Sequence, residues 1–224
     1  MKYIKARSGS KNTGSVLYIA DDGSKILRSG GSRAWRNNNP GNMRYTALSR
    51  RHGAIGSAGG FAVFPDKASG VAALSALLHG QSYINLSIYA AINKYAPATE
   101  NDTESYHKQI AKLTGLDADN KLSELNDVEF QSVINAIQVI EGYSVGTERP
   151  VRRVIRVKSN GKRITHFLID GNTSYLSASD AISLADEEEI DAVVVRPANG
   201  EAYLRASADG YIGNNFNAIV LGEG

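Results

Sequence analysis

The sequence predicts an α+β protein, with a mainly helical domain followed by a small α+β domain that contains an antiparallel sheet. Two observations carry this prediction. Apolar residues recur at helical spacing between residues 66 and 142, and β-branched runs surround Asn-Gly pairs after residue 150. The 224 residues are enough for one large or two small domains.

The first 64 residues contain little helical patterning. Residues 1–33 are rich in Gly, Ser and Lys, with two strand-like runs, SVLYIA and SKILRS, around DDGS. They predict an N-terminal arm or a small hairpin. Residues 34–64 are expected to be rich in loops, and GAIGSAGG at 53–60 is expected to be a flexible loop.

Four segments predict helices, at 66–80, 85–97, 100–115 and 125–142. Asp66 is a candidate N-cap, and the pairs Asn101 with Glu104 and Asn126 with Glu129 have the spacing of capping boxes. The four segments end at Gly80, Pro97, Gly115 and Gly142, residues that commonly terminate helices.

The pattern changes after residue 150. Two β-branched runs flank Asn160-Gly161 and predict a hairpin; SASDAISLADEEE predicts one short helix. Two further strands are expected around Asn199-Gly200, with a fifth in the tail. The predicted organisation is therefore an arm or hairpin at 1–33, a catalytic domain at 34–148 and an accessory α+β domain at 151–224.

Composition limits the chemistry. The absence of cysteine excludes disulfides, zinc–thiolate sites and cysteine nucleophiles, and the four histidines are scattered. No metal and no cofactor are expected, since no metal-ligand spacing, phosphate-binding loop or serine nucleophile motif occurs. No apolar run approaches the length of a membrane span, and the first residues lack the apolar region of a secretory signal. Carboxylate chemistry remains, of which glycosidic bond cleavage is the main case.

The positive charge is concentrated at the front of the chain. Residues 1–51 contain 11 Lys and Arg against 2 acidic residues, although the whole chain has a net charge of only +2. Such a segment could favour an anionic partner, either nucleic acid or an acidic cell-wall polymer, or it could be a solvated basic face.

Two carboxylates are candidate catalytic groups. Glu141 ends a strongly apolar helix beside Gly142 and Tyr143, where the helix dipole disfavours a negative charge and favours a protonated carboxyl group. A protonated carboxyl is what general acid catalysis needs, although a solvated terminal Glu is the alternative. Glu100, directly before a helix, is the second candidate.

The motifs WRNNNPGNMRY, FAVFPDKASGVAAL and YAPATENDTESYHKQIAKLTG, within residues 33–143, resemble a family of bacterial and phage proteins with the pattern R-N-N-N-P-G-N. Members are usually taken as lysozyme-like enzymes that degrade peptidoglycan. The resemblance implies a lysozyme-like fold and cleavage of glycan strands, by a lytic transglycosylase or a muramidase. Such a protein would act as an antibacterial effector toxin or a phage lytic protein.

The order of the motifs also resembles flagellar and autolysin glucosaminidases, in which the helix that ends in the catalytic Glu comes first. Here the helix ending in AIQVIEG comes last, so the arrangement corresponds to a circular permutation with the acid at Glu141. Amide and guanidinium groups suit N-acetyl, hydroxyl and lactyl carboxylate groups, and tyrosines, Tyr106 among them, could line a sugar groove. The expected substrate-binding residues are Arg36, Asn38, Asn39, Asn42, Arg44, Tyr95 and Tyr143.

The expected partner is peptidoglycan, together with a cognate immunity protein or a component of a delivery system, and not nucleic acid. Synthesis in the cytoplasm without a signal peptide is expected, with action in the periplasm or cell wall of a target bacterium after delivery or lysis. The alternative is a cell-wall-binding or virion structural protein without catalysis. The C-terminal part resembles a small bacterial domain of unknown function, and nothing in it suggests catalysis.

Overall fold

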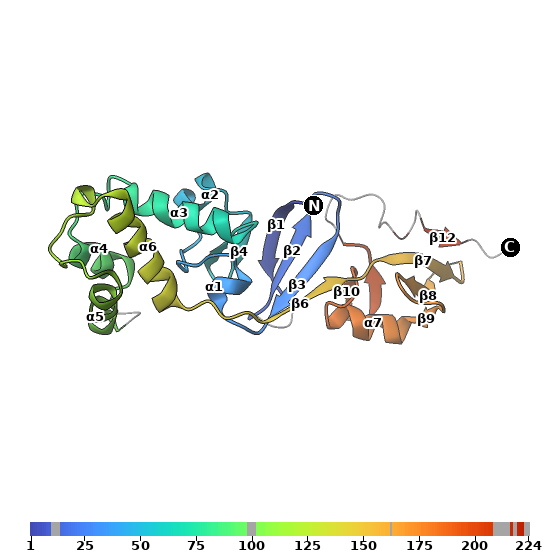
Figure 1. Cartoon of the computed structure of the whole chain (residues 1–224). Coiled ribbons are helices and arrows are strands. Elements are labelled where there is room, and N and C mark those ends of the chain that lie inside the picture. The colour runs from blue at the N-terminus through green and yellow to red at the C-terminus, as the bar shows by residue number, and fades with distance from the viewer. Residues whose placement is uncertain (10–13, 98–101, 162, 208–215, 217–218, 222–224) are drawn as a thin grey trace. The chain divides into compact units, whose positions relative to one another are not determined.

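The computed structural model of residues 1–224 describes all of the chain except 10–13, 98–101, 162, 208–215, 217–218 and 222–224 (Figure 1). Its contacts divide the chain into two compact units. The central unit is Gly30–Thr147, and the terminal unit combines Met1–Ser29 with Glu148–Gly224. The predicted segment 34–148 thus overlaps the central unit, whereas residues 1–29 group with the C-terminal part of the chain.

The central unit begins with two short helices, α1 (Arg33–Arg36) and α2 (Ala47–Arg51), followed by the hairpin of β4 (Gly56–Ala58) and β5 (Phe61–Val63). The prediction of a flexible loop at 53–60 was therefore wrong in part, because 56–58 form a strand. Gly59 and Gly60 both have positive φ, 59° and 84°, which a tight two-residue hairpin turn requires and which glycine adopts without strain.

The helices of the central unit are α3 (Lys67–His79), α4 (Ile88–Tyr95), α5 (Thr103–Thr114) and α6 (Asp127–Glu141), with a 3₁₀ turn at Leu122–Glu124. The Asp66 cap and the Asn126–Glu129 capping box are confirmed. The predicted box at Asn101 lies outside the described residues, and the N-cap of α5 is Asp102, whose side chain accepts from the Ser105 backbone N–H.

Helix α6 is at the centre of the core of this unit, and α3 and α5 pack against it (Figure 1). Its inward face, which includes Ile134 and Ile137, is almost completely buried against residues such as Leu74 and Ile110. Burying each aliphatic side chain of this kind stabilises the fold by about 1.5–3 kcal/mol. This packing fixes the position of Glu141, the last residue of α6.

The terminal unit starts with an antiparallel meander of β1 (Tyr3–Ser8), β2 (Val16–Ala20) and β3 (Lys25–Ser29). The hairpin predicted around DDGS is confirmed: β2 and β3 pair across a turn in which Gly23 has a φ of 80°. Strand β6 (Thr147–Val151), which begins at the last residue of the central unit, lies next to β3.

The rest of the terminal unit contains β7 (Val154–Ser159), β8 (Ile164–Ile169), β9 (Leu176–Ser177) and α7 (Ala178–Asp186), then β10 (Val193–Val195), β11 (Tyr203–Arg205) and β12 (Val220–Leu221). The hairpins predicted around Asn160-Gly161 and Asn199-Gly200 are confirmed as β7–β8 and β10–β11. The sheet β12-β7-β8-β9 is mostly antiparallel, as expected, and its one parallel pair joins β12 to β7.

The predicted fold class was wrong. The chain is a mixed α/β protein, with helix at 35% and strand at 26% of the described residues, and not a mainly helical lysozyme-like protein, permuted or otherwise. The cause lies in the first 64 residues, which form the strands β1 to β5, whereas the sequence predicted only the hairpin of β2 and β3 there. Within the described part of the chain, no helix has the length and apolar character needed to cross a bilayer.

Candidate functional site

The asparagine motif is built largely into the interior of the central unit. Asn37, Asn38 and Asn39 are all buried. The Asn38 amide donates to the backbone carbonyls of Phe64 and Pro65, at 3.1 Å each. These amides satisfy backbone acceptors that would otherwise be buried without a partner.

Asn39 makes the densest set of these contacts. Its Nδ2 donates to the carbonyls of Met43 and Ala62, both at 2.9 Å, and its Oδ1 accepts from the Met43 N–H at 2.9 Å. The predicted substrate-binding residues Asn38 and Asn39 therefore hold the loop at 39–43 onto β5, and neither lines the pocket described next.

The loop held in this way turns one asparagine toward a pocket. Asn42 has a φ of 48°, a left-handed conformation that asparagine adopts more readily than most residues. It lines a pocket of about 540 Å³ whose walls come from α1, the loop 41–46, α2, β5, α3, Tyr83 in the segment before α4, α4 and the end of α6. This is hereafter the Glu141 pocket, and its volume is in the range of ligand-binding clefts.

Glu141 lies in this pocket, partly buried, and accepts two hydrogen bonds. Asn42 Nδ2 donates to Oε2 at 2.8 Å, and the Tyr106 hydroxyl donates to Oε1 at 3.2 Å. Among the described residues that line the pocket, Glu141 supplies the only carboxylate. The structure therefore brings Glu141 together with Asn42, Arg44 and Tyr95 of the residues predicted from sequence.

Two tyrosines beside Glu141 stay neutral far above physiological pH. Burial raises the pKa of Tyr106, and the nearby Glu141 carboxylate raises it further. Burial also raises the pKa of Tyr95 well above its usual value, again with a contribution from Glu141. The Tyr95 hydroxyl donates to the Gly41 carbonyl, so it positions the loop next to Asn42, while Tyr106 acts on the carboxylate directly.

The pocket lining also contains three cations, Arg33, Arg44 and Lys94. The guanidinium groups of Arg33 and Arg44 lie over the Phe61 ring, 3.8 and 4.4 Å from its centroid. Lys94 lies 4.7 Å from the Tyr83 ring centroid and donates to a backbone carbonyl at 2.7 Å. Three cations against one carboxylate give the lining a positive balance, which attracts anionic ligands.

Two further predicted residues, Arg36 and Tyr143, do not line this pocket. Arg36 donates to the carbonyls of Gly30 and Gly31, and burial, with a smaller contribution from Arg33, lowers its pKa. The Tyr143 ring lies under Lys67 Nζ at 4.3 Å, and it is not among the residues that line the pocket. Glu100 lies outside the described residues.

Sequence reasoning missed Arg33, Phe61, Tyr83 and Lys94 as pocket residues. Phe61 belongs to the FAVF run, one of the motifs that carried the resemblance, and Lys94 precedes the predicted Tyr95. The position of Phe61 in a recognised motif and of Lys94 beside a predicted site residue could have indicated that they line the pocket. In the described ranges, no group of three or more His, Cys, Asp or Glu side chains is arranged to hold a metal ion.

Comparison with known proteins adds information on the terminal unit. The comparisons with curated proteins and with solved structures found no match to the chain. Residues 151–217 match a family described as a protein of unknown function, DUF3892. This match agrees with the resemblance of the C-terminal part to a small domain of unknown function, and it does not extend to the Glu141 pocket.

Proposed function

We propose that the central unit cleaves the glycan strands of peptidoglycan, with Glu141 as the general acid and then the general base. The observation that carries the proposal is the pairing of Glu141 with two neutral donors, Asn42 and Tyr106, in a pocket with a cationic lining. The resemblance of residues 33–143 to a peptidoglycan-degrading family supplies the substrate class.

In the first step, protonated Glu141 donates its proton to the glycosidic oxygen between N-acetylmuramic acid and N-acetylglucosamine, and the bond from C1 to that oxygen breaks. The step leaves a negative charge on Glu141. Asn42 Nδ2 and the Tyr106 hydroxyl are placed to donate to that carboxylate, so they stabilise a charge that forms during the reaction.

In the second step, the Glu141 carboxylate removes a proton from the nucleophile. If the nucleophile is water, its oxygen bonds to C1 and the product has a reducing end. If it is the muramic acid 6-hydroxyl, that oxygen bonds to C1 and an anhydro sugar forms. Hydrolases normally use two carboxylates, whereas the described lining of this pocket supplies one. This favours the lytic transglycosylase route.

The cationic lining fits the same substrate. Peptidoglycan carries carboxylates on its stem peptides, and guanidinium groups bind carboxylates through paired hydrogen bonds. Arg33 and Arg44 are both exposed, with their guanidinium groups held over Phe61. We assign them to the peptide-bearing side of the glycan strand. In this proposal the protein acts on the cell wall of a target bacterium, as an antibacterial effector or a phage lytic protein with a cognate immunity or delivery partner.

Digestion of purified sacculi followed by mass spectrometry tests the proposal. Anhydro-muropeptides would identify a lytic transglycosylase, and reducing muramic acid ends would identify a muramidase. Glu141→Gln should abolish product release while the variant keeps its melting temperature and still binds sacculi. Full activity of Glu141→Gln would transfer the role to Glu100, and binding of sacculi without any product from the natural sequence would identify a wall-binding protein instead.

A further inference from the structure

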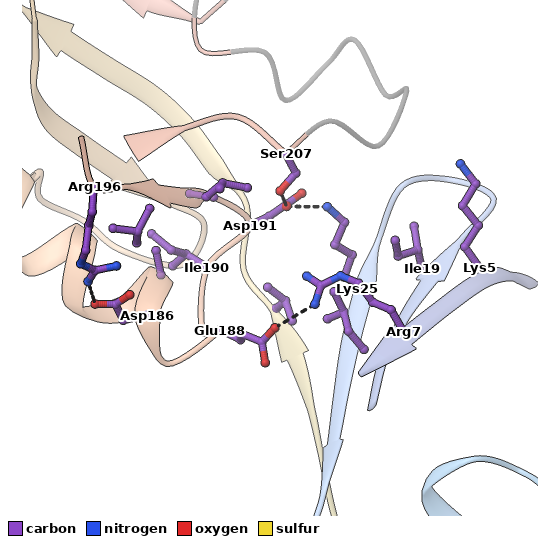
Figure 2. Close-up of a pocket in the computed structure, with 16 residues that line it drawn as sticks. Lys5, Arg7, Ile19, Lys25, Asp186, Glu188, Ile190, Asp191, Arg196 and Ser207 are labelled. Carbon is purple, nitrogen blue, oxygen red and sulfur yellow. Dashed lines mark hydrogen bonds and ion pairs between the residues drawn. The ribbon is translucent and has the colours of Figure 1, made fainter. Parts of the chain in front are cut away.

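The terminal unit contains a second pocket, of about 720 Å³, which the proposed glycan cleavage does not use. One wall is the face of the meander β1-β2-β3, and the other is formed by the end of α7, the loop after it and β10 (Figure 2). This is hereafter the Lys25 pocket, because Lys25 reaches across it from β3.

The meander wall has an apolar middle with a cation on either side. In the strand register, Ile19 lies between Lys5 and Lys25, and Leu17 pairs with Arg7. Residues directly opposite each other in antiparallel strands project from the same face of the sheet, so these side chains form one surface. The facing wall also supplies apolar side chains, among them Ile190, Val193 and Val194.

Ion pairs bridge the walls, and two of them involve Lys25 and Arg7. Lys25 Nζ lies 2.5 Å from Asp191 Oδ1, and both side chains are only 4% exposed. Ser207 Oγ donates to the same carboxylate oxygen at 2.6 Å. Arg7 Nη1 lies 3.3 Å from Glu188 Oε1, at a position where the Arg7 side chain is 54% exposed (Figure 2). A third pair, Arg196 with Asp186, is on the wall opposite the meander.

The charges of this pocket do not balance. Its lining contains four cations, Lys5, Arg7, Lys25 and Arg196, and three carboxylates, each of which has a cation partner. Lys5 has no ion-pair partner among the described residues, and Arg7 pairs with Glu188 through Nη1 alone, leaving other guanidinium donors. Two cations on neighbouring positions of one face of β1 therefore offer donors at the exposed side of the pocket.

We propose that the Lys25 pocket binds a small amphipathic carboxylate, with the apolar part between Ile19 and the β10 wall and the carboxylate at Lys5 and Arg7. A neutral apolar ligand would leave the donors of Lys5 and Arg7 unused, and a cationic ligand would meet like charges. The pocket volume is in the range that encloses most of a small ligand. The buried Lys25–Asp191 pair closes the inner end of the pocket. Lys25 already has the Asp191 carboxylate as its partner, so Lys25 is not the site for the ligand carboxylate.

Calorimetry with sodium octanoate as the probe tests the proposal on the full chain, with octan-1-ol and octylamine as probes of equal length. Octanoate should bind with at least about tenfold higher affinity than either of the other two. Equal binding of octanoate and octan-1-ol, or no saturable binding of octanoate, would overturn the proposal.

Variants then place the site. The double variant Lys5→Gln with Arg7→Gln should weaken octanoate binding about tenfold or more. Lys5→Gln alone, which breaks no ion pair among the described residues, should weaken it at an unchanged melting temperature. Ala192→Leu adds bulk in the pocket and should also weaken binding. The double variant Arg44→Gln with Lys94→Gln, in the Glu141 pocket, should leave octanoate binding unchanged. Binding that follows the second pair of substitutions and not the first would contradict the assignment.

Discussion

Asn42 and Glu141 are separated by 99 residues in sequence and joined by a hydrogen bond of 2.8 Å, from the asparagine amide to the carboxylate. Asn42 is the last asparagine of the RNNNPGN motif, and Glu141 is the last residue of α6. The bond therefore links the most distinctive motif of the chain to the carboxylate that the helix pattern singles out. The buried Asn42 Oδ1 accepts no hydrogen bond within the described structure.

Asn42→Gly should lower the rate of glycan cleavage about tenfold or more, because a hydrogen bond to a charged group is worth about 1.5–3 kcal/mol. Glycine keeps the left-handed backbone at this position. Turnover on sacculi, measured with a melting curve for each variant, checks the expectation.

Asn42→Ala is the matched control for this prediction. It removes the same amide but, unlike glycine, keeps a Cβ in the left-handed region, which alanine tolerates less well than asparagine. It should therefore lose the same activity and melt at a lower temperature than Asn42→Gly. Activity in Asn42→Gly equal to that of the natural sequence would show that the bond to Glu141 does not contribute to the reaction.

Asn39→Ala should destabilise the central unit by about 3 kcal/mol, because it leaves buried backbone groups of Met43 and Ala62 without their partners. Urea unfolding measures the change. Asn85→Ala, at an exposed position, should alter the unfolding free energy by no more than about 0.5 kcal/mol. A stable Asn39→Ala variant with impaired sugar binding would instead restore Asn39 to the substrate-binding residues.

Gly70→Ala should destabilise the protein, against the usual preference of helices for alanine. A Cβ on Gly70, in α3, would lie 2.0 Å from the Asn38 backbone oxygen and 2.9 Å from the Pro40 ring. Helix propensity alone would favour alanine by about 1 kcal/mol, whereas overpacking against backbone costs about 1–3 kcal/mol. A lower urea midpoint is expected, and a higher one would mean that the loop can move away from α3.

Arg44→Gln should raise KM for sacculi and leave kcat nearly unchanged, because the guanidinium group lies over Phe61, whereas Asn42 and Tyr106 donate to Glu141. Removing one contact to an anionic polymer should also weaken the dependence of binding on salt. Arg51→Gln, exposed and outside the pocket, is the control. Equal effects of the two substitutions would indicate general charge attraction and no role for Arg44 in the pocket.

Local signals in the sequence predicted the elements whose causes are local. The caps at Asp66 and Asn126 and the hairpins at Asn160-Gly161 and Asn199-Gly200 depend on residues close in sequence, so their patterns could be recognised directly. The helical spacing of α6 likewise placed Glu141 at the end of an apolar helix.

Distant pairing was not accessible in the same way. The grouping of Met1–Ser29 with the C-terminal part, and the parallel pairing of β12 with β7, depend on contacts between segments far apart in sequence. Nor could the sequence decide between backbone and ligand as the partner of Asn38 and Asn39. An amide offers the same donors to both, and the position of β5 settles the matter.

The stability of the protein should fall above about pH 10, and Tyr106 should account for part of the fall. Burial raises the pKa of Tyr106 in the folded state above its ordinary value of 10.0, and Glu141 adds to this. The stabilisation is complete below the unfolded-state pKa and is lost as the pH rises above it, because only the unfolded chain then releases the proton. Each tyrosine of this kind contributes a slope of about 1.4 kcal/mol per pH unit.

Urea unfolding at several pH values should therefore show a shallower decline of the unfolding free energy for Tyr106→Phe than for the natural sequence. Tyr203→Phe, at a half-exposed position, should keep the original slope, and identical slopes for all three proteins would mean that Tyr106 is open to solvent.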